Sequence, residues 1–517
     1  MADNFANRIL LSGLAPSTSG SNIGATGEVG EPIQSGTTNS DWWSWTAPHN
    51  GTFSINTKNS NLDTYLSVFT GSAVNNLTLI AQNDDAAADF TSLVTFNTTA
   101  GITYQIAVDG FSTYTGNFQL NIVPVVINGT PNNDTLTGSA YSETINGLAG
   151  NDHIIGGEGN DTLSSGDGSS HILDGGLGAD RFIGGSGRDR YEVDNVGDVV
   201  VDELPSPGVF DIVLSSVTYT LPAEIEYLTL TGTAGVIATG NNLNNIIEGN
   251  SGNNTLNGLA GDDNLLGKDG NDIIYGGDGI DNLEGGLGVD QLIGGLGNDR
   301  YGVDNTGDVV QELPDQGIDV VASSVTYTLP AEVENLYLNG TAAINGTGNN
   351  LPNTITGNAG NNTLNGGAGP DTLDGGGGQD ILTGSTGANT FFFAFGESSV
   401  SASDHITDFE IGSSKIDLWL SGLPNSFSRA ANSAAATLSD VVAQAFSDAN
   451  GGLIGTQALG TNSAALIVAT NASITGNYLV INDATAGFQA SNDLVIKLTT
   501  AGAFPPVGAI PVASFFV

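Results

Sequence analysis

Residues 258–302 consist of five consecutive nine-residue units, which read GLAGDDNLL, GKDGNDIIY, GGDGIDNLE, GGLGVDQLI and GGLGNDRYG. The first and fourth positions are glycine in every unit, the sixth is aspartate, and the eighth is leucine, isoleucine or tyrosine. A short repeat with a fixed period is typical of a solenoid, in which each unit packs on its neighbours. This stretch therefore decides the fold class of the region around it.

Each unit divides into a six-residue turn and a three-residue strand. Side chains alternate along a strand, so the eighth residue points inward while its two neighbours point outward. Glycine lets the turn take positive φ and leaves backbone carbonyl groups exposed. We expect two successive units to form one coil, with a thin aliphatic core between two parallel sheets.

The repeat occurs in three blocks along the chain. Units begin at residue 129 in the first block, at 240 in the second and at 348 in the third. The first block carries one extra residue, which the alignment places after its fifth unit. This alignment gives the fifth unit Ser170 at its sixth position and Ile172 at its eighth.

The sequence also contains a longer duplication, which includes blocks of the short repeat. DRYEVDN at 189–195 recurs as DRYGVDN at 299–305, and SSVTYTLPAE at 215–224 recurs 108 residues later. Two strand-rich inserts, at about 193–239 and 303–347, therefore follow the first two blocks. Internal duplication of this kind again favours a solenoid.

The sixth-position aspartates predict a series of cation sites. Stacked coils bring alternate units to the same edge, so their aspartates lie one above another beside exposed carbonyl groups. A site made only of carboxylate and carbonyl oxygens suits a hard cation such as calcium. The predicted metal-ligating residues are Asp134, Asp152, Asp161, Asp180, Asp189, Asp263, Asp272, Asp281, Asp290, Asp299, Asp371, Asp380, Gly157, Gly159, Gly176, Gly178, Gly277, Gly279, Gly286 and Gly288.

The spacing also ranks these sites. In the second block, aspartates face aspartates, because Asp263, Asp281 and Asp299 follow one another at intervals of one coil. Affinity falls when a ligand loses its charge, so we expect the second block to bind calcium most tightly. The weaker pairs, in which one carboxylate is replaced, are Asn353–Asp371, Asn362–Asp380 and Asp152–Ser170.

The composition excludes several classes of protein. The chain of 517 residues has 55 acidic and 10 basic side chains, for a net charge of −45, and no cysteine. Nucleic-acid binding requires Lys and Arg to neutralise phosphates, so this charge argues against it. Disulfides, zinc thiolate sites and thiol catalysis are excluded. The apolar runs are too short for a membrane span, and the first residues lack the features of a signal peptide.

The regions that flank the repeat are also β-rich. Residues 1–125 contain short alternating runs separated by Gly, Asn and Ser, which predict a β-sandwich. In residues 396–517, Leu438, Val441, Val442, Ala445 and Phe446 share one helical face, with a capping box at Thr437 and Asp440 and a stop at Gly451. We therefore expect an all-β protein: an N-terminal β-sandwich (1–125), a calcium-binding parallel β-roll or β-solenoid (126–395) and a mostly β C-terminal domain with one short helix (396–517).

The nine-residue unit resembles the RTX, or hemolysin-type, calcium-binding repeat, whose pattern is Gly-Gly-x-Gly-x-Asp-x-aliphatic-x. The strict six-residue head begins at residues 156, 175, 184, 276, 285, 294, 366 and 375. The resemblance implies a parallel β-roll with several calcium ions, export by type I secretion machinery and folding outside the cell.

The flanks carry further resemblances. DHITDFEIG at 404–412 looks like a segment that caps such rolls, and NDATAGF at 482–488 is similar to the C-terminal domain of cyanobacterial surface RTX proteins. In that family the secretion signal is C-terminal and uncleaved. DTYLSVFTG at 63–71 resembles a β-sandwich of the pre-peptidase C-terminal type, which implies no defined activity.

Three functional hypotheses remain at this point. We favour a secreted, non-enzymatic structural or adhesive protein of the cell surface or extracellular matrix, with self-assembly into a lattice or filament and binding to surface polysaccharide left open. A secreted hydrolase or toxin is the alternative, although neither His-Glu-x-x-His nor Gly-x-Ser-x-Gly occurs. A carbohydrate-binding module is the third, with Trp42, Trp43 and Trp45 as stacking platforms, although tryptophans are more often buried.

Two smaller features have a plain structural interpretation beside a functional one. His153 and His171 occupy seventh positions, so we expect them to stack on the solenoid surface, and two histidines alone make a poor zinc site. The segment 83–85, Asn-Asp-Asp, is either a polar loop or a further calcium site.

Overall fold

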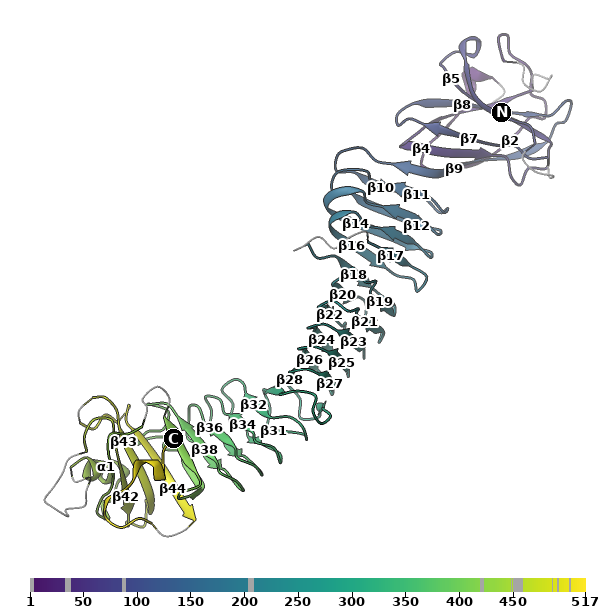
Figure 1. The fold of residues 1–517 in the computed structure, drawn as a ribbon. Helices are drawn as coiled ribbons and strands as arrows, with labels where there is room; N and C mark the ends of the chain where they lie inside the picture. Colours follow the sequence, from purple (N-terminus) through teal and green to yellow (C-terminus); the bar gives the residue numbers. More distant parts are fainter. Residues whose placement is uncertain are drawn as a thin grey trace. The chain divides into compact units, whose positions relative to one another are not determined.

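The computed structural model describes residues 4–32, 39–85, 90–202, 209–418, 423–447, 449, 459–485, 487–490, 492–501 and 504–517. The chain divides into two compact bodies, Met1–Gly232 and Thr233–Val517, which are treated separately below. The regular secondary structure of the described residues is almost entirely β-strand, with one α-helix and a few short 3-10 turns (Figure 1). The expected all-β class is therefore confirmed.

The N-terminal body begins with a two-sheet sandwich. One sheet has the order β1-β3-β8-β5-β6, and the other contains β9, β4, β7 and β2. Trp43, Trp45 and Phe53 pack between the sheets and are fully buried. The strands are β1 (Ile9–Leu11), β2 (Ser17–Ser21), β3 (Asp41–Thr46), β4 (Asn50–Asn56), β5 (Thr64–Thr70), β6 (Thr78–Asn83), β7 (Leu93–Thr98), β8 (Thr103–Gly110) and β9 (Asn117–Asn128).

The solenoid of the N-terminal body continues one sheet of the sandwich. The second half of β9 pairs in parallel with β11, so Ile127 lies beside Ile145 at the base of the first coils. One sheet continues through β11 (Thr144–Asn146), β13 (Thr162–Ser164), β15 (Arg181–Ile183) and β17 (Val199–Val201). The facing sheet contains β10 (Thr135–Thr137), β12 (His153–Glu158), β14 (Asp167–Leu177), β16 (Ser186–Val193), β18 (Ile212–Ser215) and β20 (Tyr227–Leu230).

The C-terminal body contains the second and third blocks. Leu265 pairs with Leu283 in one sheet and Ile274 pairs with Leu292 in the other, so the register advances by one coil of eighteen residues. One sheet contains β22 (Ile246–Glu248), β24 (Asn264–Asp269), β26 (Asn282–Leu287), β28 (Arg300–Val303), β30 (Val320–Ser323), β32 (Asn335–Leu338), β34 (Thr354–Thr356), β36 (Thr372–Asp374), β38 (Thr390–Phe393) and β40 (Lys415–Leu418). Facing it are β21 (Ile237–Thr239), β23 (Thr255–Ala260), β25 (Ile273–Asp278), β27 (Gln291–Leu296) and β29 (Val309–Gln311), and then β31 (Tyr327–Thr328), β33 (Gly346–Thr347), β35 (Thr363–Asn365) and β37 (Ile381–Thr383).

The inserts continue the solenoid instead of interrupting it. Tyr191 pairs with Val213, and Val213 pairs with Leu228, which places the first insert in the same parallel sheet as the repeats. In the C-terminal body, Tyr301 pairs with Val321 in the same way. The eighth-position side chains and the valines that succeed them are fully buried. The predicted thin aliphatic core is confirmed.

The C-terminal domain extends one solenoid sheet. Strand β39 (His405–Glu410) pairs with β37 on one side and with β44 on the other. The sheet then runs through β44 (Leu494–Ala501), β43 (Gly476–Asn482), β42 (Ser463–Ala469), β41 (Phe427–Arg429) and β45 (Gly508–Ala509). The predicted helix is α1 (Leu438–Ser447), whose buried face packs on this sheet. Thr437 Oγ1 accepts the backbone N–H of Asp440, which is the N-cap half of the predicted capping box, and donates to the Asp440 carboxylate; Gly451 lies outside the described residues.

The position of the extra residue in the first block corrects the sequence alignment. Ile154 pairs with Leu173, not with Ile172, and Leu173 is fully buried. The register shifts between Asp167 and Ser170, inside the turn of the fifth unit. The sixth position of that unit is therefore His171 and the eighth is Leu173. Neighbouring units do not reveal where in a turn one residue is added, because the turn has no side-chain alternation.

Candidate calcium sites

The sixth-position aspartates form continuous ladders along the edges of the coils. The backbone N–H of Asp263 donates to Oδ1 of Asp281 at 2.8 Å, and the N–H of Asp281 donates to Oδ1 of Asp299 at 2.8 Å. On the second edge, the N–H of Asp272 donates to Oδ1 of Asp290 at 2.7 Å. One carboxylate oxygen of each aspartate therefore ties two coils together, and the predicted one-coil stacking is confirmed for these pairs.

The second oxygen of most ladder aspartates is buried without a hydrogen-bond partner. These side chains are at most 2% exposed. A buried acceptor with no donor is costly, and a run of them points to a missing positive charge. Ten of the twelve predicted aspartates have such an Oδ2: Asp152, Asp161, Asp180, Asp263, Asp272, Asp281, Asp290, Asp299, Asp371 and Asp380.

Five of the ten unpartnered oxygens face a backbone carbonyl of the next coil across the first glycine of their unit, namely those of Asp152, Asp161, Asp263, Asp272 and Asp281. A Cβ atom at Gly276 would lie 2.3 Å from Asp281 Oδ2 and 2.6 Å from the carbonyl oxygen of Gly294 in the next coil. The same pair of oxygens converges over Gly267, where the distances are 2.3 and 2.5 Å to Asp272 Oδ2 and Gly285 O. Both groups are acceptors with no donor between them, so the donor set fits a hard cation.

The eight predicted turn glycines all have positive φ, as expected. The close approach of neighbouring coils adds a second requirement for glycine. A Cβ at Gly288 would lie 1.6 Å from the carbonyl oxygen of Gly270, and one at Gly178 would lie 1.5 Å from that of Gly159. The turns therefore stack at a distance that only a residue without a side chain allows.

Burial changes the acidity of the ladder in the metal-free protein. It raises the pKa of Asp281 to about 6 and that of Asp263 to about 7, although the backbone N–H bonded to each carboxylate opposes the shift. The ladder carboxylates are therefore poised to exchange protons for a cation near neutral pH.

The units at the block edges are closed without a metal. Asn254 Oδ1 accepts the backbone N–H of Asn250 at 2.8 Å, and its amide nitrogen donates to Asn250 Oδ1 at 3.2 Å. Asp134, a predicted ligand, is partly exposed and accepts hydrogen bonds from the amide and hydroxyl of Thr130. Hydrogen bonds within the turn therefore satisfy Asn254 and Asp134 in the metal-free protein.

The first block differs from the second at one ladder position. The backbone N–H of Asp152 donates to Nδ1 of His171 at 3.2 Å, where the regular pattern has a carboxylate. His171 is 1% exposed, so it does not stack on the surface with His153 as predicted. Its Nδ1 accepts a hydrogen bond, so the proton of the neutral ring is on Nε2. The Nε2 side of the ring is therefore unsuited to a cation. Asp189 also differs, because its Oδ2 accepts the N–H of Gly185 at 3.0 Å.

Sequence reasoning missed the aspartates that extend the ladders beyond the glycine-rich turns. The N–H of Asp380 donates to Oδ1 of Asp404, whose Oδ2 is buried and unpartnered, and burial raises the pKa of Asp404 to about 8. A signal was present, because each of these aspartates stands two residues before a buried aliphatic residue, as in the repeat. The added ladder residues are Asp198, Asp211, Asp308, Asp319 and Asp404.

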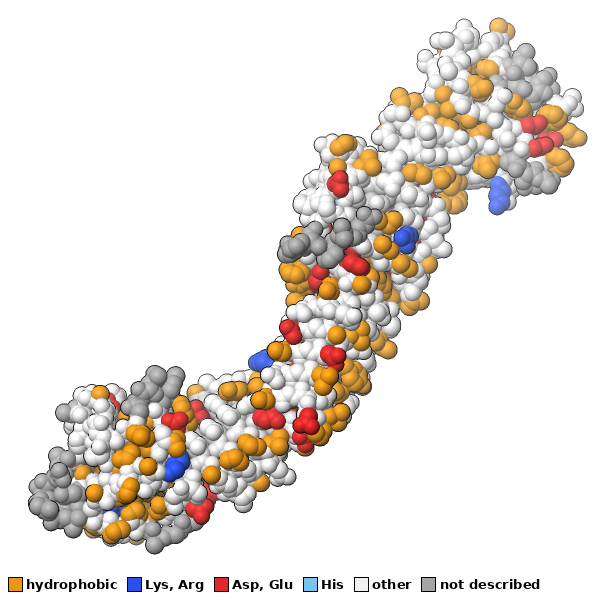
Figure 2. Space-filling model, in the orientation of Figure 1, with side chains coloured by type: hydrophobic (Ala, Val, Ile, Leu, Met, Phe, Trp, Pro, Cys, Tyr) orange, Lys and Arg blue, Asp and Glu red, His pale blue; other side chains and the backbone are white. Residues whose placement is uncertain are grey.

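Most of the acidic ladder is hidden from the surface. On the face drawn in Figure 2, acidic side chains appear as scattered spots and not as a continuous acidic face. The fully buried ladder aspartates account for part of this, because at least ten of the chain's carboxylates lie inside the turns.

The fold and the site together define a class: a parallel β-solenoid whose glycine turns present stacked carboxylates to cations. The RTX calcium-binding nonapeptide repeat (4 copies) family model matches residues 137–172, 172–191, 239–274, 266–301 and 347–391. These segments are RTX calcium-binding repeats, and the ion that the ladders bind is calcium. No curated protein matches the chain. No helix in the described part is long and apolar enough to cross a membrane.

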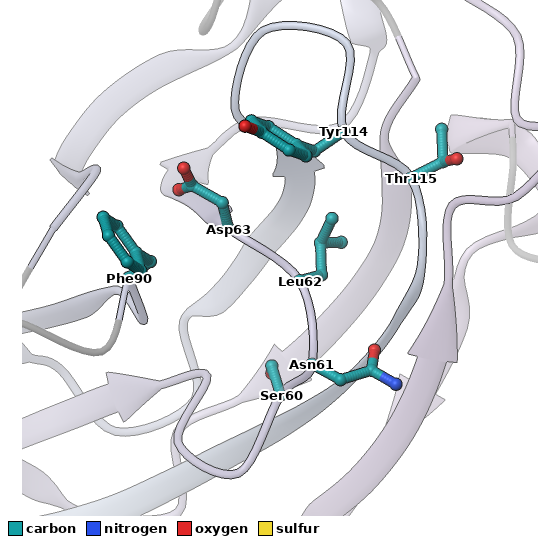
Figure 3. A pocket seen from close by; sticks show the side chains of 7 residues that line it. All are labelled: Ser60, Asn61, Leu62, Asp63, Phe90, Tyr114 and Thr115. Atoms are coloured by element: carbon teal, nitrogen blue, oxygen red, sulfur yellow. The ribbon is translucent and has the colours of Figure 1, made fainter.

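A cavity in the sandwich is a second candidate for a functional site. It has a volume of about 440 Å³, and Asp63, Phe90 and Tyr114 are among the residues that line it (Figure 3). Its lining contains no histidine, and Ser60 Oγ donates to the carbonyl of Thr57 instead of facing a base. The cavity therefore lacks a nucleophile–base pair among its lining residues.

Two further candidates lie in the sandwich. Carboxylate oxygens of Asp63, Asp84 and Asp85 lie within 4.8 Å of one another; Asp85 is exposed, whereas Asp63 and Asp84 are half-buried and each has one buried oxygen without a partner. Trp42, Trp43 and Trp45 are at most 1% exposed, so they offer no face for stacking on a sugar. The structural interpretation of the three tryptophans is confirmed.

Proposed function

We propose that this protein is a secreted, non-enzymatic component of the cell surface or extracellular matrix that takes its structure from extracellular calcium. The observation that carries the proposal is the series of buried, unpartnered carboxylate oxygens along both edges of the coils. RTX repeat proteins are typically secreted. Type I secretion machinery would export the chain before these carboxylates are neutralised.

The chain's own residues supply the switch. In low calcium, the stacked carboxylates repel one another and disfavour the compact solenoid. Calcium, when bound, supplies the positive charge that the unpartnered oxygens lack. The ladder hydrogen bonds then hold each aspartate in place, and the free energy of binding becomes free energy of folding.

A structural or adhesive role suits the rest of the molecule better than catalysis. The sandwich cavity has no histidine in its lining, and the solenoid consists of repeated turns. Self-assembly and polysaccharide binding belong to this proposal as modes of attachment. The sandwich pairs with a solenoid sheet in the N-terminal body, and the C-terminal domain pairs with one in the C-terminal body, so each covers one end of the solenoid in its own body.

Circular dichroism of the full chain tests the calcium switch. We expect the strand signal to fall in excess EGTA, by the share that the solenoid contributes, and to return in millimolar calcium. A strand signal that is unchanged after complete removal of calcium would contradict the proposal. Electron microscopy with and without calcium tests assembly, and turnover of ester, peptide or glycoside substrates that is lost on mutation of Asp63 would favour an enzyme instead.

A further inference from the structure

Three buried carboxylates meet where the second block of repeats joins its insert. Oxygens of Asp299, Glu312 and Asp319 lie within 4.8 Å of one another, and all three side chains are at least nine-tenths buried. Asp299 precedes β28, Glu312 follows β29 and Asp319 precedes β30, so two of the three come from the insert.

Glu312 occupies the place of a missing turn. It stands one coil after Gly294, where a regular unit would have its first glycine. Over Gly276, the Asp281 carboxylate faces a carbonyl oxygen of the next coil. Over Gly294, a Cβ atom would lie 2.2 Å from Asp299 Oδ2 and 2.5 Å from Glu312 Oε1. A carboxylate therefore replaces the carbonyl at the end of the block.

Tyr301 is the second indication of a ligand. Its side chain is fully buried, and its hydroxyl has no hydrogen-bond partner among the described residues. A Cβ atom at Gly294 would lie 2.1 Å from the Tyr301 hydroxyl. This hydroxyl is therefore directed into the space between Asp299 and Glu312. Oδ2 of Asp299 is also without a partner. The Tyr301 hydroxyl can donate only one hydrogen bond, so it cannot satisfy the unpartnered oxygens of both Asp299 and Glu312. These converging buried acceptors call for a cation.

The arrangement recurs in the duplicated module of the N-terminal body. Asp189, Asp202 and Asp211 form a buried group of the same kind, and Tyr191 donates its hydroxyl to Asp202 at 3.2 Å. An acid is present at this position in both copies, although the side chain is Asp in one and Glu in the other. The family matches end at residues 191 and 301, so the insert acids lie outside the nonapeptide repeat.

On the other edge of the solenoid, the ladder ends at an aspartate, Asp308, that needs no cation. Oδ1 of Asp308 accepts the N–H of Asp290, and its Oδ2 accepts backbone N–H groups of Asp304 and Asn305 at 3.2 and 3.0 Å. Both oxygens of Asp308 are therefore satisfied by the chain itself. The group at Glu312 has no comparable closure at Asp299.

We propose that the group of Asp299, Glu312 and Asp319 is a divalent-cation site that closes the second block of repeats and is built with residues of the insert. In the N-terminal copy, by contrast, hydrogen bonds from a backbone N–H and the tyrosine hydroxyl already satisfy Asp189 and Asp202. The choice of calcium as the ion rests on the proposed function. The site at Asp299, Glu312 and Asp319 has one carboxylate more than a turn in which a carbonyl fills that place. It therefore binds more tightly than the interior turns of the same block, since affinity rises with ligand charge.

Calcium titration of the full chain by calorimetry tests the site. Glu312→Gln keeps the shape but removes the charge, and Glu284→Gln, in the same block on the half-exposed outer face, is the matched control. We expect E312Q to lose its tightest calcium step, with affinity reduced about 10- to 100-fold or more, while E284Q resembles the unmodified protein. An E312Q protein with the original number of ions and affinities would overturn the proposal.

Terbium provides a second measurement that does not depend on the stability of E312Q. Terbium bound at the site should emit when tyrosine is excited, because Tyr301 lies against it. We expect Tyr301→Phe to reduce this emission, whereas Tyr275→Phe, on the exposed face of the same block, leaves it nearly unchanged. Equal emission from the two variants would place no cation at Tyr301. A chain that takes up no calcium at all would instead contradict the proposed function.

Discussion

The sandwich and the solenoid are both β structures, but they are stabilised in different ways. In the sandwich, aromatic side chains such as Trp43, Trp45 and Phe53 from two sheets form one core. A solenoid coil buries only one or two apolar side chains from each strand, and many coils add a buried carboxylate with an unpartnered oxygen. The difference shows that apolar burial is sufficient for one region, whereas the other needs an external charge to complete its turns.

Chelation should therefore separate the two regions, and this is the largest expected effect. Hydrogen exchange in excess EGTA should show loss of protection in the repeat blocks and retention in strands β3, β4 and β8 of the sandwich. Three of the four tryptophans lie in the sandwich, so their fluorescence should change little. Simultaneous loss of both signals would mean that the sandwich depends on the coils.

Acidification should partly replace calcium in the solenoid. Burial raises the pKa of Asp281 from 3.8 to about 6 in the metal-free fold, so the protonated form favours folding. This contribution is fully present below pH 3.8 and is lost as the pH rises through about 6. Metal-free protein should therefore gain strand signal between pH 7 and pH 5. In calcium, the same protons compete with the ion, so affinity should fall over this range.

Glycine substitutions in the turns should test the stacking distance. Gly288→Ala places a methyl group against the carbonyl of Gly270 at positive φ and should destabilise the calcium-loaded fold by about 1–3 kcal/mol or more. Gly377→Ala is the matched control, because its Cβ would lie 3.6 Å from its nearest neighbour. Thermal unfolding in calcium measures both, and similar melting temperatures would show that the coils can separate.

A single charge should have the smallest effect. Asp281→Asn keeps an oxygen for the N–H of Asp263 and removes one carboxylate, so affinity should fall by about 10-fold or more at that site. Asp134→Asn should leave calcium binding nearly unchanged, because Thr130 already satisfies Asp134. Calorimetric titration compares the two, and a matching loss in D134N would show that Asp134 is also a ligand.

Much of the fold and most of the site can be predicted from the sequence, because the nine-residue period determines which residues are buried and which lie in the turns. The unit places Leu283 inside and Asp281 at the turn, and the structure agrees at both positions. The prediction failed where the period is broken. The extra residue moved His171 into the ladder, and insertions of irregular length concealed Asp211 and Asp319. Whether an aspartate is already satisfied, as at Asp134, depends on a neighbouring hydroxyl that the period does not specify.

The histidine in the first block has a consequence for how the array fills. Each ladder bond joins an aspartate to the next coil, so occupancy at one turn is communicated only to its immediate neighbours, as in a one-dimensional lattice. The ladder bonds continue through His171, but this residue interrupts the series of carboxylates between Asp152 and Asp189 on one edge, whereas the opposite edge has aspartate at every step from Asp161 through Asp180 to Asp198. We therefore expect the two edges of the same coils to have different correlation lengths, with one side of the block filling as two short segments and the other as one.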